Sequence, residues 1–389
     1  KPNLLFILHN SGPMNWSYMP DRLGVSSGTA DQPYAQWYGY RTAQCNGIAY
    51  DPAVTYSPPV DSTGAEYTAS SFSAAWPDGY TKDSTVNLAQ ATSITTSSIS
   101  NGTGTKTFTM TAGTYSSSTF TEGDAVTITS TTNSAASMSG VITSWGYSNT
   151  WSGRVWSLEV LVSESAGSGS YTNWTVTLTP TYYTYKAPGT QAAVNWTYNS
   201  DGGVDTSTTF YQECTSNIGS TPGSNVFEKH TVTSTSAEAT NYANWYSYYR
   251  KRYLLMRTAM GRAISPLNEN YRVGFSTISD AGVVDGASDG GSGTGYFRDV
   301  KDFTPAQKAN FYSSLYGSEP NGSTPLRVAL AKAGRYFGKR FDDQYDPMQY
   351  SCQRNYALLS TDGYWNGDKG VQLDGTTTIG QQDGYEVRP

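Results

Sequence analysis

The apolar run Leu4–Leu8 constrains the fold of this chain more than any other feature. It is too short for a helix of ordinary length, and the turn-forming residues Asn10, Gly12 and Pro13 follow it closely. This pattern is typical of a strand buried on both faces in the middle of a parallel sheet. In open sheets of this kind, ligands bind beyond the carboxyl ends of the strands. Residues 9–14 are therefore predicted to lie where a binding site is most expected.

The composition indicates a large core and a weakly charged surface. Of the 389 residues, 14% are charged and 14% are aromatic, with 31 Tyr and 39 Gly but only two His. We interpret this balance as that of a bacterial cell-surface protein. The net charge of −6 and the lack of a Lys/Arg patch argue against a nucleic-acid partner, because such binding depends on neutralising phosphates. No apolar stretch approaches ~18 residues, so the chain is not expected to span a membrane.

The three cysteines, Cys45, Cys214 and Cys352, are an odd number. One disulfide with one free or intermolecular thiol is compatible with this count, and so are three reduced thiols. Their spacing matches no cysteine pattern for metal binding. The chain begins directly at the first predicted strand, which we interpret as a removed leader or a shortened sequence.

The composition divides the chain into segments. Residues 1–20 hold the first strand and its loop, and residues 21–90 are an irregular insertion rich in Tyr, Trp, Pro and Gly, interpreted as a cover over the sheet edge. Residues 91–240 are rich in Ser and Thr, with alternating stretches that predict an inserted antiparallel β sandwich or barrel. Its Trp and Tyr residues are interpreted as core and edge positions, with contact to a sugar or protein as the alternative.

The host domain is predicted to return at residues 241–389. An apolar stripe from Trp245 to Ala263 predicts a helix that packs on a sheet. The cations Arg250–Arg252 and Arg257 are interpreted as its solvated face, with contact to an acidic partner as the alternative. Helix followed by strand is typical of α/β folds. The later predicted elements are strands at 271–278 and 296–300, a hairpin tip at 280–295, helices that start at Thr304 and Thr324, each followed by proline, and a buried strand at 355–360.

Three short oxygen-bearing residues are predicted to meet at the carboxyl edge of the sheet. Ser11 follows the first strand, Thr324 starts a helix, and Asp362 follows the strand at 355–360. Oxygen ligands from several loops are what a hard divalent cation requires, and Mg²⁺ takes few protein oxygens and keeps several waters. Each residue alone is a weak signal, but their order along the chain is more specific.

This order resembles a known site. A buried strand ending in Asp-x-Ser-x-Ser, a later Thr and a later Asp-Gly form the metal-ion-dependent adhesion site of von Willebrand factor type A domains. Longer stretches of the chain are similar to the PilY family of type IV pilus tip proteins. These stretches are 4–8, 10–12, 14–16, 243–250, 302–307, 323–327, 333–337 and 352–367, so the match covers residues 1–20 and, with gaps, 241–367.

The resemblance implies an α/β fold of the von Willebrand factor type A (Rossmann-like) kind, a mostly parallel sheet with helices on both faces that carries a large inserted β region. It implies a protein exported to the bacterial envelope, at the pilus tip or secreted. Such a protein acts with minor pilins in pilus assembly or priming and adheres to a host-surface protein or glycan. Larger members carry a C-terminal β-propeller with a calcium loop, which nothing in this chain resembles. The sheet would normally continue beyond Pro389, so we expect a fragment of a longer protein.

Two positions depart from the family motif. His9 stands where the motif has its first Asp, and Pro13 stands where it has its second Ser. The first change removes a charge and an oxygen ligand, and proline supplies neither a hydroxyl nor an amide donor. We therefore predict a remnant metal site at Ser11, Thr324 and Asp362, with no cofactor expected. The alternatives are a weakly bound divalent cation and a transition metal held by His9 with Asp362, since imidazole suits Zn²⁺, Cu²⁺ and Ni²⁺.

An enzyme is not expected. His9, Ser11 and Asp362 could imitate a hydrolase triad, but the chain has no Gly-x-Ser-x-Gly motif, and a triad is recognised by geometry. We therefore expect a non-enzymatic protein of type IV pilus assembly and surface adhesion with a degenerate metal site. The alternative is a purely structural tip-capping subunit that has no external ligand.

Overall fold

The computed structural model describes residues 1–25, 32–151, 153–186, 195–279, 296–341, 345–363, 365–367 and 369–380. These residues form a mixed α/β protein with several separate sheets. The chain divides into two compact units. The first comprises Lys1–Trp16, Pro58–Thr68 and Lys251–Pro389, and the second comprises Ser17–Ser57 and Ala69–Arg250. The predicted hairpin tip at 280–295 lies outside the described residues.

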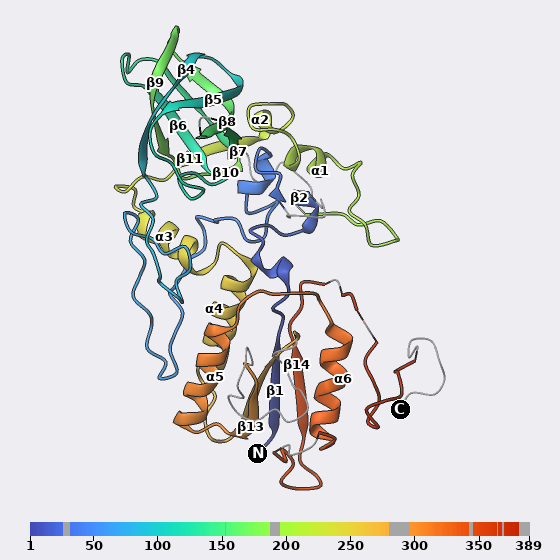
Figure 1. The fold of residues 1–389 in the computed structure, drawn as a ribbon. Coiled ribbons are helices and arrows are strands. Elements are labelled where there is room, and N and C mark those ends of the chain that lie inside the picture. The colour runs from blue at the N-terminus through green and yellow to red at the C-terminus, as the bar shows by residue number, and fades with distance from the viewer. Residues whose placement is uncertain are drawn as a thin grey trace. The chain divides into compact units, whose positions relative to one another are not determined.

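A four-stranded sheet forms the centre of the first unit (Figure 1). Its strand order is β13 (Arg298–Asp302), β12 (Arg272–Thr277), β1 (Asn3–Leu8) and β14 (Asn355–Leu359). β1 is parallel to both β12 and β14, whereas β12 and β13 are antiparallel. The apolar run at the start of the chain is therefore a central strand, as predicted.

Helices cover both faces of this sheet. They are α4 (Arg252–Ile264), α5 (Pro305–Gly317) and α6 (Leu326–Phe337), and the short 3₁₀ helix η1 (Gly12–Asn15) follows β1. Because side chains alternate along a strand, Phe6 contacts Phe311 of α5 at 5.7 Å between ring centroids, while Leu5 and Ile7 share a core with Ala333 of α6. α4 lies beside α5, where the Tyr312 hydroxyl donates to the Gly261 carbonyl over 2.6 Å.

The predicted start of α5 is confirmed. Thr304 is its N-cap residue, and the side chain accepts a hydrogen bond from the backbone N–H of Gln307, with Pro305 in the first turn. α6 differs, because it begins at Leu326 and its N-cap residue is Pro325. Thr324 precedes this helix without capping it.

One prediction about a helix and two predictions about burial were wrong. The helix predicted from Trp245 to Ala263 is broken into α3 (Ala239–Tyr248) and α4, and Arg252 and Arg257 are buried, not solvated. The strand at 355–360 forms as β14 but is exposed along most of its length, with Leu358 58% exposed. β14 is at the edge of the described sheet and pairs only with β1 there, which explains its exposure.

A closed antiparallel barrel is the largest part of the second unit (Figure 1). Its strands are β4 (Ala91–Ser100), β5 (Gly104–Ala112), β6 (Ala125–Ser130), β7 (Ser137–Thr150), β8 (Gly153–Ala166) and β9 (Ser170–Leu178), in the order β4-β5-β8-β7-β6-β9. Alternate residues such as Phe108, Leu158 and Trp174 are fully buried and fill the interior. The alternating Ser/Thr-rich stretches therefore form a barrel, one of the two predicted architectures.

Short elements make up the rest of the second unit. They are the paired strands β2 (Gly24–Val25) and β3 (Gln32–Pro33), the paired strands β10 (Thr181–Tyr185) and β11 (Phe227–Thr231), the helices α1 (Thr209–Cys214), α2 (Gly223–Val226) and α3, and the 3₁₀ helices η2 (Asp21–Leu23) and η3 (Tyr38–Arg41). A disulfide joins Cys45 to Cys214, and Cys352 is free and exposed.

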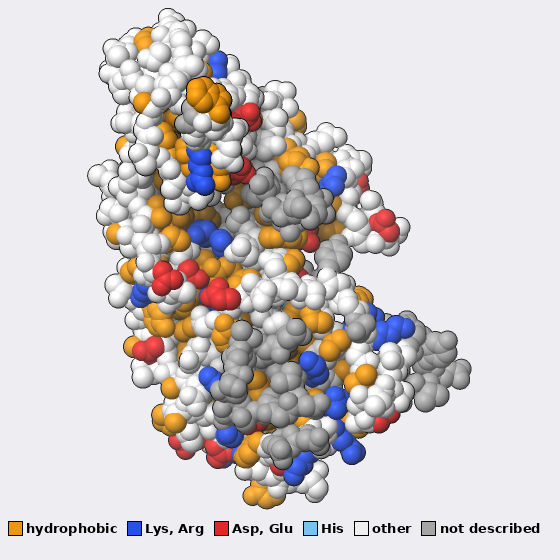
Figure 2. Space-filling model, in the orientation of Figure 1, with side chains coloured by type: hydrophobic (Ala, Val, Ile, Leu, Met, Phe, Trp, Pro, Cys, Tyr) orange, Lys and Arg blue, Asp and Glu red, His pale blue; other side chains and the backbone are white. Residues whose placement is uncertain are grey.

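The surface agrees with the composition. Most side chains on the face seen in Figure 2 are uncharged. Among the helices that the structure describes, none is both long enough and apolar enough to cross a membrane.

Candidate functional site

The parallel pairing of β1 and β14 brings two loops together at the carboxyl edge of the sheet. Ile7 is in register with Leu359, so both strands end at the same level. His9 and Ser11 follow β1 and are buried, and Asp362 follows β14 and is almost buried. The two residues that the sequence analysis placed in these loops, Ser11 and Asp362, are therefore close neighbours of His9.

His9 connects the two loops through both nitrogens of its imidazole ring. Its Nε2 lies 2.6 Å from Ser11 Oγ, and its Nδ1 accepts a hydrogen bond of 3.1 Å from the backbone N–H of Asp362. The His9 backbone N–H also donates to Ser360 Oγ over 2.9 Å. Because Nδ1 is an acceptor, a neutral ring carries its proton on Nε2 and donates it to Ser11.

The surroundings of His9 favour this neutral form. Burial lowers the pKa of His9 below its usual value of 6.5, because the charged ring would lose its hydration. The Asp362 carboxylate, with Oδ1 3.3 Å from His9 Nδ1, opposes the shift, and the Arg252 guanidinium reinforces it. His9 is therefore a hydrogen-bonding bridge between the loops at neutral pH.

Arg252 supplies the positive charge opposite Asp362. Its Nη1 lies 3.1 Å from Asp362 Oδ2, and both side chains are almost completely buried. The guanidinium lies over the Trp16 ring, 4.8 Å from the centroid, and the Arg252 backbone N–H donates to the Trp16 carbonyl over 3.0 Å. Asp362 is thus neutralised by a side chain from the first turn of α4.

Thr324 is attached to the same loops through its backbone. Asn366 Oδ1 accepts from the Thr324 N–H over 2.7 Å, and the Asn366 N–H donates to the Thr324 carbonyl over 3.0 Å. Nearby, Gly12 N–H donates to the Gly322 carbonyl over 3.0 Å. Within the described residues, no hydrogen bond joins the Thr324 hydroxyl to Ser11 or Asp362.

The arrangement of His9, Ser11 and Asp362 does not fit a site for a hard divalent cation. Both nitrogens of His9 and the Ser11 hydroxyl are engaged in hydrogen bonds, and Asp362 is paired with a guanidinium. A cation would have to displace these contacts and lie near Arg252. Across the described ranges there is no group of three or more His, Cys, Asp or Glu side chains able to hold a metal. The remnant metal site stays a prediction.

The same contacts oppose a hydrolase mechanism. Ser11, His9 and Asp362 are in triad order, but a general base must accept the serine proton on the nitrogen that faces it. Here the Asp362 N–H occupies His9 Nδ1, so the neutral ring donates from Nε2. Ser11 is also fully buried.

Arg252 and Trp16 were not identified as site residues from the sequence. The cationic run was interpreted as solvated, with an acidic partner only as the alternative. Arg252 lies in the first turn of α4, where a positive charge faces the positive end of the helix dipole. An unfavourable charge at this position is a signal that a specific acidic partner holds it. That signal does not identify the partner, which lies 110 residues away in the sequence.

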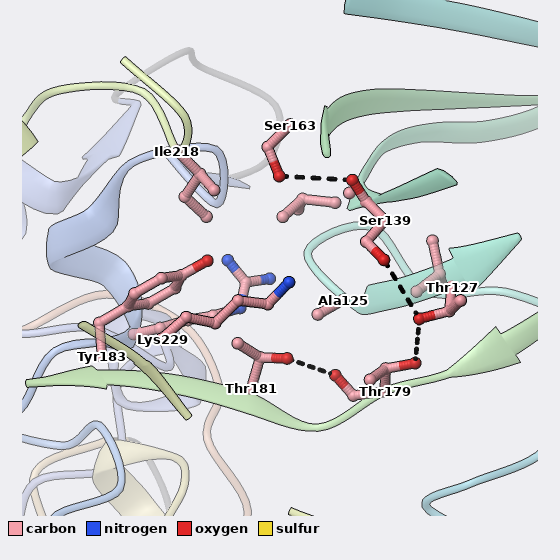
Figure 3. Close-up of a pocket in the computed structure, with 13 residues that line it drawn as sticks. Ala125, Thr127, Ser139, Ser163, Thr179, Thr181, Tyr183, Ile218 and Lys229 are labelled. Atoms are coloured by element: carbon pink, nitrogen blue, oxygen red, sulfur yellow. Dashed lines mark hydrogen bonds between the residues drawn. The ribbon is translucent and has the colours of Figure 1, made fainter. Parts of the chain in front are cut away.

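A second candidate is a small polar cavity in the second unit (Figure 3). Its volume is about 20 Å³, and its lining includes Arg41, Thr127, Ser139, Thr179 and Lys229. The hydroxyls bond to one another, as in the Thr179–Thr127 contact of 3.0 Å shown in Figure 3. Lys229 pairs with Glu164 over 2.8 Å. A cavity of this size holds about one water, so we interpret it as part of the packing.

The chain is similar to type IV pilus biogenesis factors named PilY1. It is 27% identical over 376 residues to PilY1 of Pseudomonas aeruginosa strain UCBPP-PA14, covering 94% of this chain and 23% of that protein. It is 24% identical over 383 residues to PilY1 of strain PAK, with 94% and 24% covered. These matches support a PilY family relationship.

The similarity is stronger in one part of the chain. The identity to PilY1 of Pseudomonas aeruginosa strain PAO1 is 38% in an alignment of 137 residues, which covers 33% of this chain and 12% of that protein. The chain spans about a quarter of the length of the two PilY1 relatives that it matches over most of its own length. No family model matches this chain, and no solved structure matches it significantly.

Proposed function

We propose that this chain acts in type IV pilus biogenesis on the bacterial surface, at the pilus tip, where it works with minor pilins and adheres to surfaces. The observation that carries the proposal is the similarity to PilY1 biogenesis factors over 94% of the chain. Biogenesis comes from the names of these relatives. The tip location, the minor pilins and adhesion come from the family resemblance of the sequence motifs.

The first unit is proposed to be a von Willebrand factor type A domain. Support comes from the central position of β1, its parallel neighbours β12 and β14, and the helices on both faces of the sheet. The candidate site also lies where the resemblance places it, in the loops after β1 and β14. Functional sites in open parallel sheets form at this edge.

The strand-end site is proposed to be a degenerate adhesion site that works without a resident metal. His9 replaces the first aspartate of the motif and joins Ser11 to Asp362 by direct hydrogen bonds. Arg252 supplies the positive charge that a cation would otherwise bring to Asp362. Adhesion is then expected to involve another surface of the chain.

Removal of the barrel tests whether adhesion depends on the barrel while pilus assembly does not. Ala91 and Thr177 are paired neighbours, so residues 91–178 can be replaced by a short Gly-Ser linker between Gln90 and Thr179. A strain that lacks its own copy of the gene would be complemented with the full protein carrying either the native chain or this deletion. We expect both to restore surface pili, and only the native chain to restore adhesion to host cells. Failure of the native chain to restore pili would contradict the proposed role.

A purely structural tip-capping role is the second candidate. It is favoured by the internal pairing of the polar groups at the strand ends, which leaves few of them for an external ligand. In that case minor pilins would co-purify with the native chain, while adhesion would be the same with the native chain and with the barrel deletion.

A further inference from the structure

β7 and β8 extend beyond the barrel as a two-stranded ribbon. β6 pairs with β7 as far as Val141, and β5 pairs with β8 only from Ser157 onward. Closer to the tip, Tyr147 is opposite Trp156 and Asn149 is opposite Arg154. Among the described residues, these outer parts of β7 and β8 pair only with each other.

A row of aromatic side chains leads from the barrel core to the exposed end of this ribbon. Trp145 and Trp156 stack at 4.8 Å between ring centroids, and Tyr147 contacts Trp156 at 4.9 Å. Exposure rises toward the tip of the ribbon, from 7% for Trp156 to 42% for Tyr147 and 100% for Trp151. The outermost rings therefore present apolar surface to solvent that contributes little to the barrel core.

Arg154 adds a positive charge to this surface. Its guanidinium lies over the Tyr147 ring, 4.3 Å from the centroid, and the residue is exposed. The carboxylates that the structure describes include none in an ion pair with Arg154. The tip thus combines exposed aromatic rings with a cation free to meet an acidic ligand.

We propose that the β7–β8 tip, defined as Tyr147, Trp151 and Arg154, binds acidic polysaccharide. The ring face of Trp151 can contact the C–H face of a sugar ring, which removes apolar surface from water, while the Tyr147 ring lies under Arg154 and positions its guanidinium. The guanidinium can pair with a sugar carboxylate through parallel hydrogen bonds. The exposed Asn149 amide on the same ribbon is suited to sugar hydroxyls, whereas the Thr150 hydroxyl already donates to the Gly153 carbonyl over 2.7 Å.

The size of the tip favours a sugar over a folded protein. A stable protein interface buries roughly 800 Å² on each partner, with a well-packed centre. The β7–β8 tip offers two exposed rings and one cation on a narrow ribbon, an area that matches a few sugar units. This inference rests on the proposed adhesive role and names its ligand class.

Binding to immobilised hyaluronan, which carries a carboxylate on alternate sugars, tests the proposal against neutral dextran. The full chain would be compared with Trp151→Ala, Arg154→Gln and the matched control Tyr198→Ala, another exposed aromatic of the same unit. We expect the native chain to bind hyaluronan and not dextran. Trp151→Ala should weaken binding about threefold to tenfold, as expected for the loss of one aromatic contact. Arg154→Gln should abolish the preference for the acidic polymer, and Tyr198→Ala should bind as the native chain does.

Equal binding of all variants to hyaluronan would overturn the proposal, as would equal binding of the native chain to dextran. Binding only to a protein-coated surface, lost in Trp151→Ala, would also overturn it in favour of a protein ligand. Thermal unfolding controls for folding, since an exposed tip residue should leave the midpoint unchanged. Normal pilus number with Trp151→Ala separates the two proposals, because the biogenesis role then stands whatever the polysaccharide result.

Discussion

The residue that most defines the candidate site is His9. A carboxylate at this position would need a cation to offset its charge against Asp362, whereas a neutral imidazole can bond to Ser11 and to the Asp362 backbone at once. The charge of Asp362 is instead balanced by Arg252. In the proposed metal-free site, His9 links the two loops and Arg252 neutralises Asp362, the two roles that a bound metal has in the motif that the sequence resembles.

Asp362→Asn should strongly destabilise the first unit. It leaves the buried guanidinium of Arg252 without its carboxylate, and removal of one partner from a buried ion pair costs about 3–5 kcal/mol of unfolding free energy. Urea denaturation measures the loss. The double variant Arg252→Met/Asp362→Leu removes both charges and should recover most of the stability. If Asp362→Asn lowers the unfolding free energy by less than about 1 kcal/mol, the Arg252–Asp362 pair behaves like a surface ion pair and the prediction is wrong.

Acid should weaken the fold through His9. Its pKa is lowered in the folded chain, so the unfolded chain binds the proton more readily. The stability that His9 contributes is therefore complete above pH 6.5 and is lost as the pH falls below that value. Urea denaturation between pH 7.5 and 5 should show a steeper decline for the native chain than for His9→Asn.

The comparison with His9→Asn is needed because a second group titrates in this range. Burial raises the pKa of Asp124 to about 6, so the folded chain binds a proton at this carboxyl more readily than the unfolded chain does. Protonation of Asp124 therefore stabilises the fold as the pH falls, which is opposite to the effect of His9. Both chains share Asp124, so the difference between them isolates His9. Parallel pH profiles would contradict the assigned role of His9.

At the scale of elements, local patterns predicted some segments and long-range contacts decided others. β1 and the start of α5 could be predicted, because an apolar run and the Thr304–Pro305–Gln307 cap act within a few residues. The break between α3 and α4 could not, since Arg252 is held by Trp16 and Asp362 from distant parts of the chain. The exposure of β14 depends on which strands lie beside it, which its own apolar sequence does not reveal.

The sheet also depends on a buried arginine at the other end of its strands. Arg272 of β12 donates from Nε to Asn3 Oδ1 of β1 over 2.9 Å, pairs with Asp302 of β13 over 2.8 Å, and donates to the Val300 carbonyl. Arg272→Leu should lower the unfolding free energy by about 2–4 kcal/mol, because the Val300 carbonyl and Asn3 Oδ1 each lose a buried hydrogen bond, and only Gln353 Nε2 still donates to Asn3 Oδ1, over 3.2 Å. Arg262→Ala is a suitable control.

Arg262 is a matched arginine of the same unit. It is partly exposed and pairs with exposed Glu66 over 3.0 Å, so its loss should cost less than about 1 kcal/mol in the same denaturation experiment. If Arg272→Leu and Arg262→Ala lower the unfolding free energy by similar amounts, the contacts of Arg272 with β1 and β13 do not stabilise the sheet as proposed.

For the whole molecule, the disulfide could not be predicted from composition. Cys45 and Cys214 are separated by 169 positions, and the sequence left their pairing open. The second unit draws on distant parts of the chain, since Cys45, Phe210 and Tyr183 share one core. The strand-end site was predicted in outline, because the residues after β1 and β14 meet as expected, but the partners of His9 follow from the packed structure.

Loss of the disulfide should affect the second unit specifically. Closure of so long a loop restricts the unfolded chain, and Cys45→Ser/Cys214→Ser should cost about 3–5 kcal/mol. Hydrogen exchange should show faster opening of η3 and α1, with β1 and β12 unchanged. A maleimide should label one thiol per native chain, at exposed Cys352. Labelling of three thiols without reductant would contradict the assigned pairing.

Thermal unfolding in Mg²⁺, Mn²⁺ or EDTA tests most directly whether side chains, and not a metal, hold the strand ends together. A ligand that binds only the folded state raises the unfolding midpoint. We predict the same midpoint for the native chain in all three conditions, because Ser11, His9 and Asp362 already have protein partners. The variant His9→Asp/Pro13→Ser, which restores the motif, should gain a Mg²⁺-dependent rise. A rise for the native chain in Mg²⁺ that EDTA reverses would contradict the metal-independent site.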